Sequence, residues 1–123
     1  MKDLDVLQSI NEYRKSQHLK EYTWNHLIAE KALEHSTNMA NEKISFSHDG
    51  WSERYKELSK SISNIKSGSE NIAFSKPDMN PVNEWKKSHG HNKNLLSDAN
   101  LCGLGYVEKN GKHYYTAIFM KNI

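Results

Sequence analysis

The chain has 123 residues, which is the length of one domain, and we expect residues 1–123 to form a single one. Its 17 basic and 15 acidic residues give a net charge of +2, and the basic residues are scattered along the sequence. This balance gives no strong electrostatic argument for nucleic acid or an anionic membrane as a partner. No stretch approaches the roughly 20 apolar residues of a membrane span, so we predict no transmembrane segment.

The first part of the chain is predicted to be helical. Apolar residues recur at helical spacing over residues 5–18 and again from Asn25 to Asn41, where Asn25 can cap the helix. Residues 19–23 link these two helices. A turn-rich loop at residues 43–50 leads into a short predicted helix over residues 51–58. Because both long helices are amphipathic, each needs another layer to pack against.

The second half contains the predicted strands. Residues 70–74 are expected to be extended, and a helix over residues 82–87 is expected to end by Gly90. Residues 101–108 and 113–120 are predicted strands joined by an Asn-Gly turn, the strongest short signal for a hairpin. Helices followed by a closing hairpin indicate an α+β fold in which helices cover a small antiparallel sheet.

Histidines are the first candidates for chemistry, since the chain has seven. His48 lies in a predicted turn, and His89 and His91 flank Gly90. Imidazole can bind a metal, carry a proton or donate a hydrogen bond. His89 and His91 could chelate a metal by themselves if the chain were extended there, whereas His48 and His91 can meet only through tertiary folding.

Two further residues have alternative interpretations. Glu70 begins an otherwise apolar extended segment, so it is either a strand-end charge in water or a carboxylate at the rim of a site. Cys102 is the single cysteine, so no intramolecular disulfide can form. Its apolar neighbours predict a buried strand thiol rather than a nucleophile.

Several stretches, taken in order, resemble the CAP superfamily, which includes cysteine-rich secretory proteins, venom antigens, pathogenesis-related proteins and small bacterial relatives. The stretches are Ala32–Ala40 followed by Phe46-Ser47-His48, then Glu70-Asn71-Ile72-Ala73, Val82–Leu96, Gly103-x-Gly105 and Tyr114–Phe119. In the family a glycine precedes the Glu-Asn-Ile-Ala motif, and this chain has Ser69 at that position. Each motif alone is modest, but their order along nearly the whole chain is specific.

The resemblance implies a three-layer α-β-α sandwich with a cleft that holds two histidines and two glutamates. Carried over by position, the histidines are His48 and His91, the metal ligands of the family, and the first glutamate is Glu70, which is followed by Asn71. Ser88 stands at the position of the second glutamate. The tetrad is therefore incomplete, and we expect at most weak Zn²⁺ binding by two imidazoles.

Three functions follow from this resemblance. The first is a monomeric, extracellular or cell-surface binding module for a lipid, a sterol or a host protein, with lipid anchoring through a segment outside this sequence. The alternative is a zinc-assisted, peptidase-like hydrolase in which His48 and His91 hold the metal and Glu70 is the general base. The third is an inert scaffold in which His48, Glu70 and His91 only stabilise the fold. The incomplete tetrad favours a non-enzymatic role and leaves enzymatic activity open.

Overall fold

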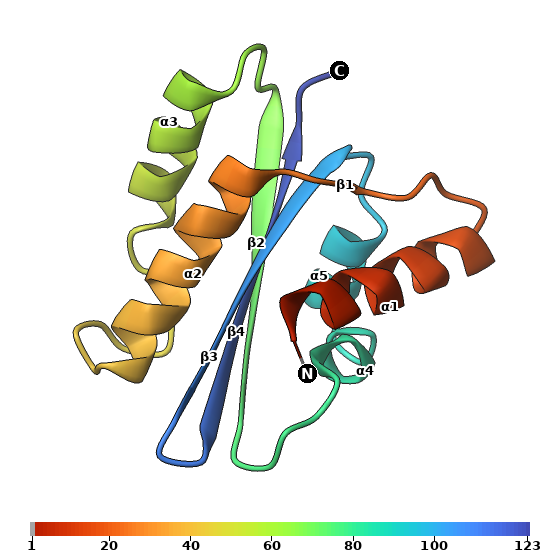
Figure 1. Cartoon of the computed structure of the whole chain (residues 1–123). Helices are drawn as coiled ribbons and strands as arrows, with labels where there is room; N and C mark the ends of the chain where they lie inside the picture. The colour runs from red at the N-terminus through yellow and green to blue at the C-terminus, as the bar shows by residue number, and fades with distance from the viewer. Residues whose placement is uncertain (1) are drawn as a thin grey trace.

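The computed structural model describes residues 2–123 (Figure 1). The elements follow in the order α1 (Asp3–Ser16), β1 (Thr23–Trp24), α2 (His26–Ala40), α3 (Trp51–Ser61), β2 (Ser67–Ser75), α4 (Pro81–Trp85), α5 (His89–Leu95), β3 (Leu101–Lys109) and β4 (Lys112–Lys121).

The strands form one sheet in the order β1-β3-β4-β2. β4 pairs antiparallel with both β2 and β3, which confirms the predicted hairpin and the antiparallel core of the sheet. β1 adds a parallel pair in which Thr23 faces Leu101. The predicted link therefore ends in a strand. Two residues are too few for an alternating pattern, so the sequence did not predict this strand.

Helices cover both faces of this sheet, so the predicted α+β fold with three α-β-α layers is confirmed. α2 and α3 pack on one face, and α1, α4 and α5 pack on the other (Figure 1). The buried face of α1 centres on Val6 and Ile10, and that of α2 on Ile28 and Ala32. Because each helix is apolar on one side only, burying both stripes requires a layer on each side of the sheet.

Two glycines of β3 set the distance between α2 and the sheet. A Cβ at Gly103 would lie 2.2 Å from the backbone nitrogen of Ala29, and a Cβ at Gly105 would lie 2.2 Å from that of Leu33. Ser36 of α2 donates a hydrogen bond to the Gly105 carbonyl at 3.0 Å. This close packing fixes α2, and with it the start of the loop that carries His48.

The structure corrects one predicted boundary and confirms the buried thiol. Gly90 does not end a helical region but lies inside the separate helix α5, which begins at His89. So short a helix has little propensity of its own and depends on tertiary contacts such as the buried Leu95. Cys102 is fully buried, and burial raises the pKa of its thiol far above the usual range.

Candidate functional site

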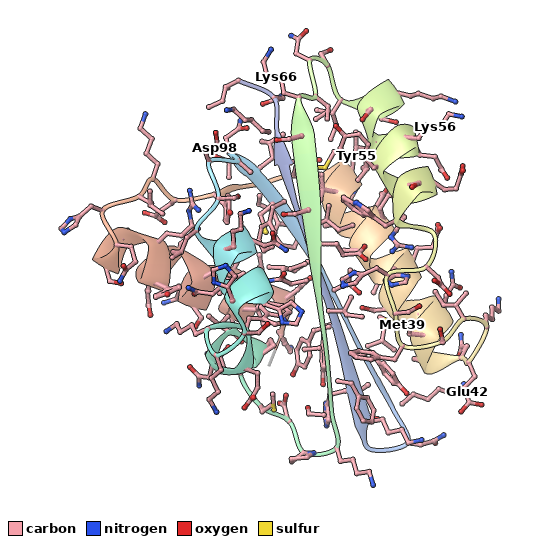
Figure 2. All side chains as sticks on the ribbon, turned by 180° about the vertical axis from the view of Figure 1, so that it is seen from behind. Met39, Glu42, Tyr55, Lys56, Lys66 and Asp98 are labelled. Atoms are coloured by element: carbon pink, nitrogen blue, oxygen red, sulfur yellow. The ribbon has the colours of Figure 1, made fainter. Side chains whose placement is uncertain are left out.

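The site is built around β2, which is an edge strand of the sheet. Successive side chains of a strand point to opposite faces, so Glu70 faces α3 while Asn71 faces α5. β2 lies between α5 on one side and α3 with its preceding loop on the other (Figure 2). Two segments far apart in the sequence, the loop with His48 and the helix with His91, therefore meet at one strand.

Glu70 is the centre of a charged network. Arg54 of α3 holds the carboxylate with two atoms, since Nε lies 2.8 Å from Oε2 and Nη2 lies 2.7 Å from Oε1. The Nδ1 atom of His48 lies 2.8 Å from the same Oε1. Arg54 also donates to the backbone carbonyls of Asp49 and His48, at 2.8 and 3.3 Å. The loop is thereby tied to the helix that follows it and to β2.

Glu70 is ionised in this setting. Burial raises the pKa of its carboxyl group, but hydrogen bonds from His48 and Arg54 and the charge of Arg54 outweigh burial and hold the pKa below its usual value. Its side chain is only 1% exposed, and both of its oxygens accept hydrogen bonds. Glu70 is therefore a buried structural anion in the wall that Arg54 and His48 form on one side of β2, not an open carboxylate at the surface.

His35 of α2 completes this wall. Its ring is buried, with Nε2 2.8 Å from the Ser47 carbonyl oxygen and 3.9 Å from Glu70 Oε1. Its Nδ1 has no hydrogen-bond partner within residues 2–123. Burial and then the nearby charge of Arg54 lower the pKa of His35, so the ring is neutral and donates from Nε2 to the loop.

Neither His35 nor Arg54 was predicted from the sequence to be part of the site. One signal was present, since a histidine among apolar positions of a helix face needs a hydrogen-bond partner. Nothing in the sequence marked Arg54, because a charge in an amphipathic helix is normally exposed.

Neutral amides build the opposite wall. Asn71 is fully buried, donates from Nδ2 to the His91 carbonyl at 3.1 Å and accepts from Asn94 Nδ2 at 2.9 Å. Trp85 of α4 donates from its indole nitrogen to the Ile72 carbonyl at the strand edge, at 2.9 Å. The two Asn71 bonds hold α5, and therefore His91, beside β2, and the Trp85 bond holds α4 there.

The two predicted histidines belong to segments that bind neighbouring residues of β2, His48 through Glu70 and the His91 backbone through Asn71. His91 is partly buried, and its pKa is lowered by burial and then by the charge of His48. The His48 side chain is 49% exposed, and its only ring hydrogen bond within residues 2–123 is the one through Nδ1 to Glu70. This bond directs the Nδ1 proton to the carboxylate and leaves Nε2 as the nitrogen with a lone pair.

The remaining candidates contribute less. Ser88 is the half-buried residue before α5, and its side chain does not cap the helix. His89 and His91 lie in the first turn of α5, where positions two apart do not face each other. The helix thus removes the extended chain that chelation by this tripeptide requires.

The described residues of this site meet only part of the requirements of a metal site, because they supply two imidazoles and no further free ligand. Within residues 2–123, no group of three or more histidine, cysteine, aspartate or glutamate side chains could hold a metal ion. Both Glu70 oxygens already accept hydrogen bonds from Arg54 and His48. Glu70 therefore supports the His48 ring and is not available as a metal ligand. The donors that remain are His48 Nε2 and the His91 ring, a set typical of a weak site completed by water.

The three layers and the polar network at the edge strand β2 define a small α-β-α sandwich domain. The model of the cysteine-rich secretory protein family, CAP, matches residues 7–120, so the chain belongs to the CAP family. No curated protein matches it at the sequence level.

Solved structures of bacterial surface and extracellular proteins have the same fold. An outer surface protein of Borrelia burgdorferi matches with a TM-score of 0.81 and 18% identity, over 96% of this chain and 90% of that one. An extracellular protein with an SCP domain from Bacillus anthracis str. Ames matches with a TM-score of 0.83 and 26% identity, over 97% of this chain. A cysteine-rich secretory protein of Staphylococcus aureus subsp. aureus Mu50 matches with a TM-score of 0.74 and 24% identity, over 96% of this chain. The chain spans 40% of the Bacillus protein and 38% of the Staphylococcus protein.

None of the helices within residues 2–123 combines the length and the apolar character that a bilayer crossing needs.

Proposed function

We propose that this CAP domain is an extracellular or cell-surface binding module whose cleft binds a divalent metal ion weakly through His48 and His91. The observation that carries the proposal is the 2.8 Å contact between His48 Nδ1 and Glu70 Oε1. A carboxylate behind a histidine fixes the tautomer and raises the basicity of the opposite nitrogen, which is the usual support of a metal-binding imidazole. The surface and extracellular relatives support the proposed location.

Zinc is the ion that suits such a site, because neutral imidazole is among its preferred ligands. The lowered pKa of His91 favours the neutral form that a metal needs. His48 Nε2 and the His91 ring would hold the ion, and a bound zinc ion would supply a Lewis acid at the mouth of the cleft. Two protein ligands make a site of low affinity.

Calorimetric titration of zinc into the purified domain at neutral pH tests this proposal. We expect weak binding in the wild type and loss of the heat in His48→Ala and His91→Ala, because each variant leaves a single imidazole. His26→Ala is the matched control, since His26 is an exposed histidine at the start of α2. Absence of heat in the wild type, or equal heat in all four proteins, would overturn the proposal.

The hydrolase alternative loses its base in this geometry. A general base must reach the proton of a bound water, but the Glu70 oxygens are buried against Arg54 and His48 and its pKa is lowered. We therefore expect no peptide turnover with or without zinc. Turnover that requires zinc and disappears in both His48→Ala and His91→Ala would reinstate the hydrolase.

The macromolecular or lipid ligand of the module is a separate proposal. A lipid, a sterol or a host protein fits the surface location, as do a monomeric state and lipid anchoring through a segment outside this sequence. Sedimentation of the domain tests the monomer. A panel of lipids and host proteins tests the ligand, and failure of every member to bind would leave the inert scaffold as the better description.

A further inference from the structure

The edge of the sheet beside β1 is covered only in part. β1 pairs with the first two residues of β3, and no strand within residues 2–123 continues along this side of β3. Asn25 donates from its backbone nitrogen to the Cys102 carbonyl at 2.9 Å, so the backbone groups of Cys102 face this edge. Residues two apart in a strand point their backbone groups the same way, so those of Tyr106 and Glu108 face it too. Within residues 2–123 these N–H and C=O groups of Tyr106 and Glu108 have no hydrogen-bond partner.

A recess of about 370 Å³ lies beside this open length of β3. It is lined by Trp24 of β1, by Leu104 and Tyr106 of β3, and by Ala29 and Leu33 of α2. In Figure 1, β3 runs in front of the other long strands, between α2 on one side and α1 on the other. Leu104 is buried, whereas Leu33 is 46% exposed. The recess therefore has an apolar base and opens where β3 lacks a neighbour, and its volume lies in the range of ligand pockets, roughly 300–1,000 Å³.

The charged residues around the recess are mainly acidic. They are Lys2, Asp3 and Glu30, and a shallow pocket that adjoins the recess along α2 adds Glu34. Three carboxylates against one lysine leave an excess of two negative charges, with His26, which lines the recess and contacts Glu30 at 2.7 Å, counted as neutral. Glu30 and Glu34 are both exposed and lie one turn apart on α2. The α2 side of the recess is therefore complementary to basic side chains.

We infer that an extended peptide segment adds to the sheet beside β3, as a strand that continues the line of β1. Unpaired backbone donors and acceptors at strand spacing are complementary to another extended polypeptide, and alternate side chains of the added strand enter the pockets on its two faces. The segment is apolar on the face toward Trp24 and Leu104, and basic on the face toward Glu30 and Glu34.

A separate segment fits this edge better than a second copy of the domain does. A second copy presents the same edge between the same two helices, so helix would meet helix before the two β3 strands could pair. The recess also lies at the opposite edge of the sheet from β2, which anchors the segments of His48 and His91. The inference is therefore independent of the metal proposal.

A synthetic peptide tests the inference. The probe is a peptide of about eight residues with blocked ends, in which valine and lysine alternate, since this length covers a typical strand. We expect it to bind with a Kd on the order of 0.1 mM, and hydrogen exchange at the Tyr106 and Glu108 amides to slow by at least about tenfold at saturation. The same peptide with every amide N-methylated keeps the side chains but has no backbone donor, so it should bind at least about tenfold more weakly. A peptide with its valines in one block and its lysines in another is the control for composition.

Variants of the domain test the backbone and the recess separately. Glu108→Pro removes one N–H that faces the open edge, and Glu108→Ala is its matched control because it removes the same side chain and keeps the N–H. We expect the proline variant to bind the alternating peptide roughly fivefold more weakly than the alanine variant. Leu33→Ser should weaken binding by about fivefold, whereas Leu27→Ser, at an exposed leucine of α2 outside the recess, should bind like the wild type.

The acidic side of the recess is tested by charge. Glu30→Gln with Glu34→Gln should weaken binding of the alternating peptide by roughly fivefold and reduce its dependence on salt. Glu12→Gln with Glu53→Gln makes the same change of charge at exposed positions elsewhere and should have little effect. Circular dichroism at the assay temperature confirms that each variant is folded.

Three outcomes would overturn the inference. The first is no binding of the alternating peptide at about 1 mM. The second is equal binding of the N-methylated peptide, since backbone pairing would then play no part. The third is self-association of the domain that slows exchange at Tyr106 and Glu108 without any peptide, because a second copy of the chain would then be the occupant. His48→Ala with His91→Ala should bind the peptide like the wild type, so failure of the metal proposal and failure of this inference are separate results.

Discussion

Glu70 and Asn71 are neighbours in β2, yet they anchor the walls on the two sides of this strand by different interactions. Glu70 holds its wall through charge, since it is buried against the guanidinium of Arg54 and the ring of His48. Asn71 holds the other wall through neutral amides, by bonds to the His91 carbonyl and to Asn94. The same strand therefore fixes both histidines of the site by two chemistries.

The difference determines how each wall responds to conditions. A buried ion pair is weak evidence for net stability, but removing one partner leaves an uncompensated charge and is costly. An amide network loses less when it is broken, and it has no proton to gain or lose between acid and neutral pH. We therefore expect the wall of Glu70 to be sensitive to substitution and pH, and the wall of Asn71 to be sensitive to substitution alone.

The largest effect is expected for Glu70→Gln. The amide preserves the shape of the side chain but leaves the Arg54 charge buried without its carboxylate, which should lower the free energy of unfolding by about 3–5 kcal/mol. Urea unfolding at neutral pH measures the change. Glu57→Gln is the control, because Glu57 forms an exposed pair with Lys31 and its loss should be within error. A loss below about 1 kcal/mol for Glu70→Gln would show that the ion pair is not what holds this wall.

A smaller effect is expected for Asn71→Ala. The substitution removes one donor and one acceptor from a fully buried site and leaves the Asn94 amide without its partner, at a cost of about 2–3 kcal/mol. Hydrogen exchange should accelerate in α5 more than in α3, because α5 loses its anchor. Asn83→Ala, on the exposed side of α4, is the matched control. Equal acceleration in both helices would contradict a separate amide wall.

The pH dependence of stability sharpens the comparison further and is expected to be smaller again. The pKa of His35 is lowered from its ordinary 6.5, so the unfolded chain binds this proton first and stability falls as pH drops below about 6.5. The pKa of Glu70 is lowered from its ordinary 4.5, so its contribution is complete above that pH and is lost as pH falls through the lowered value. Both act in the same direction in separate pH ranges.

Urea unfolding measured from about pH 8 to about pH 3 separates these contributions, because the ordinary pKa values of histidine and glutamate differ by about two units. His35→Gln should flatten the curve near pH 6, and the gap between the wild type and Glu70→Gln should narrow below pH 4.5. The gap between the wild type and Asn71→Ala should stay constant throughout. A gap for Asn71→Ala that varies with pH would remove the distinction between the two walls.

Much of the architecture could be predicted because it rests on repeating patterns. The apolar stripe of α2, the cap at Asn25 and the Asn-Gly turn before β4 each carry a local signal that the structure bears out. The CAP resemblance predicted the three layers, and the family match supports it. Helix and strand periodicities report which face is buried, so they are most reliable where packing is regular.

The parts that could not be predicted depend on contacts between distant segments. Arg54 is part of the site only because α3 packs beside β2, and no local pattern distinguishes it from a solvated arginine. α5 begins at His89 and includes Gly90, because tertiary contacts outweigh the low helical propensity of glycine. Glu70 was identified by position in a motif, but its burial and its commitment to Arg54 required the fold.

The smallest effect on stability is expected for His48→Ala, and it tests whether the charged wall has two parts. The His48 ring is about half exposed, and Arg54 still contacts both Glu70 oxygens after the ring is removed. The backbone carbonyl of His48, which accepts from Arg54, is unaffected by the substitution. We therefore expect a loss below about 1 kcal/mol, together with loss of zinc binding. The Arg54–Glu70 pair would then be the structural part of the wall and His48 its exposed ligand. If His48→Ala instead destabilises the domain as much as Glu70→Gln, the three residues act as one structural unit, and the case for His48 as a metal ligand is weakened.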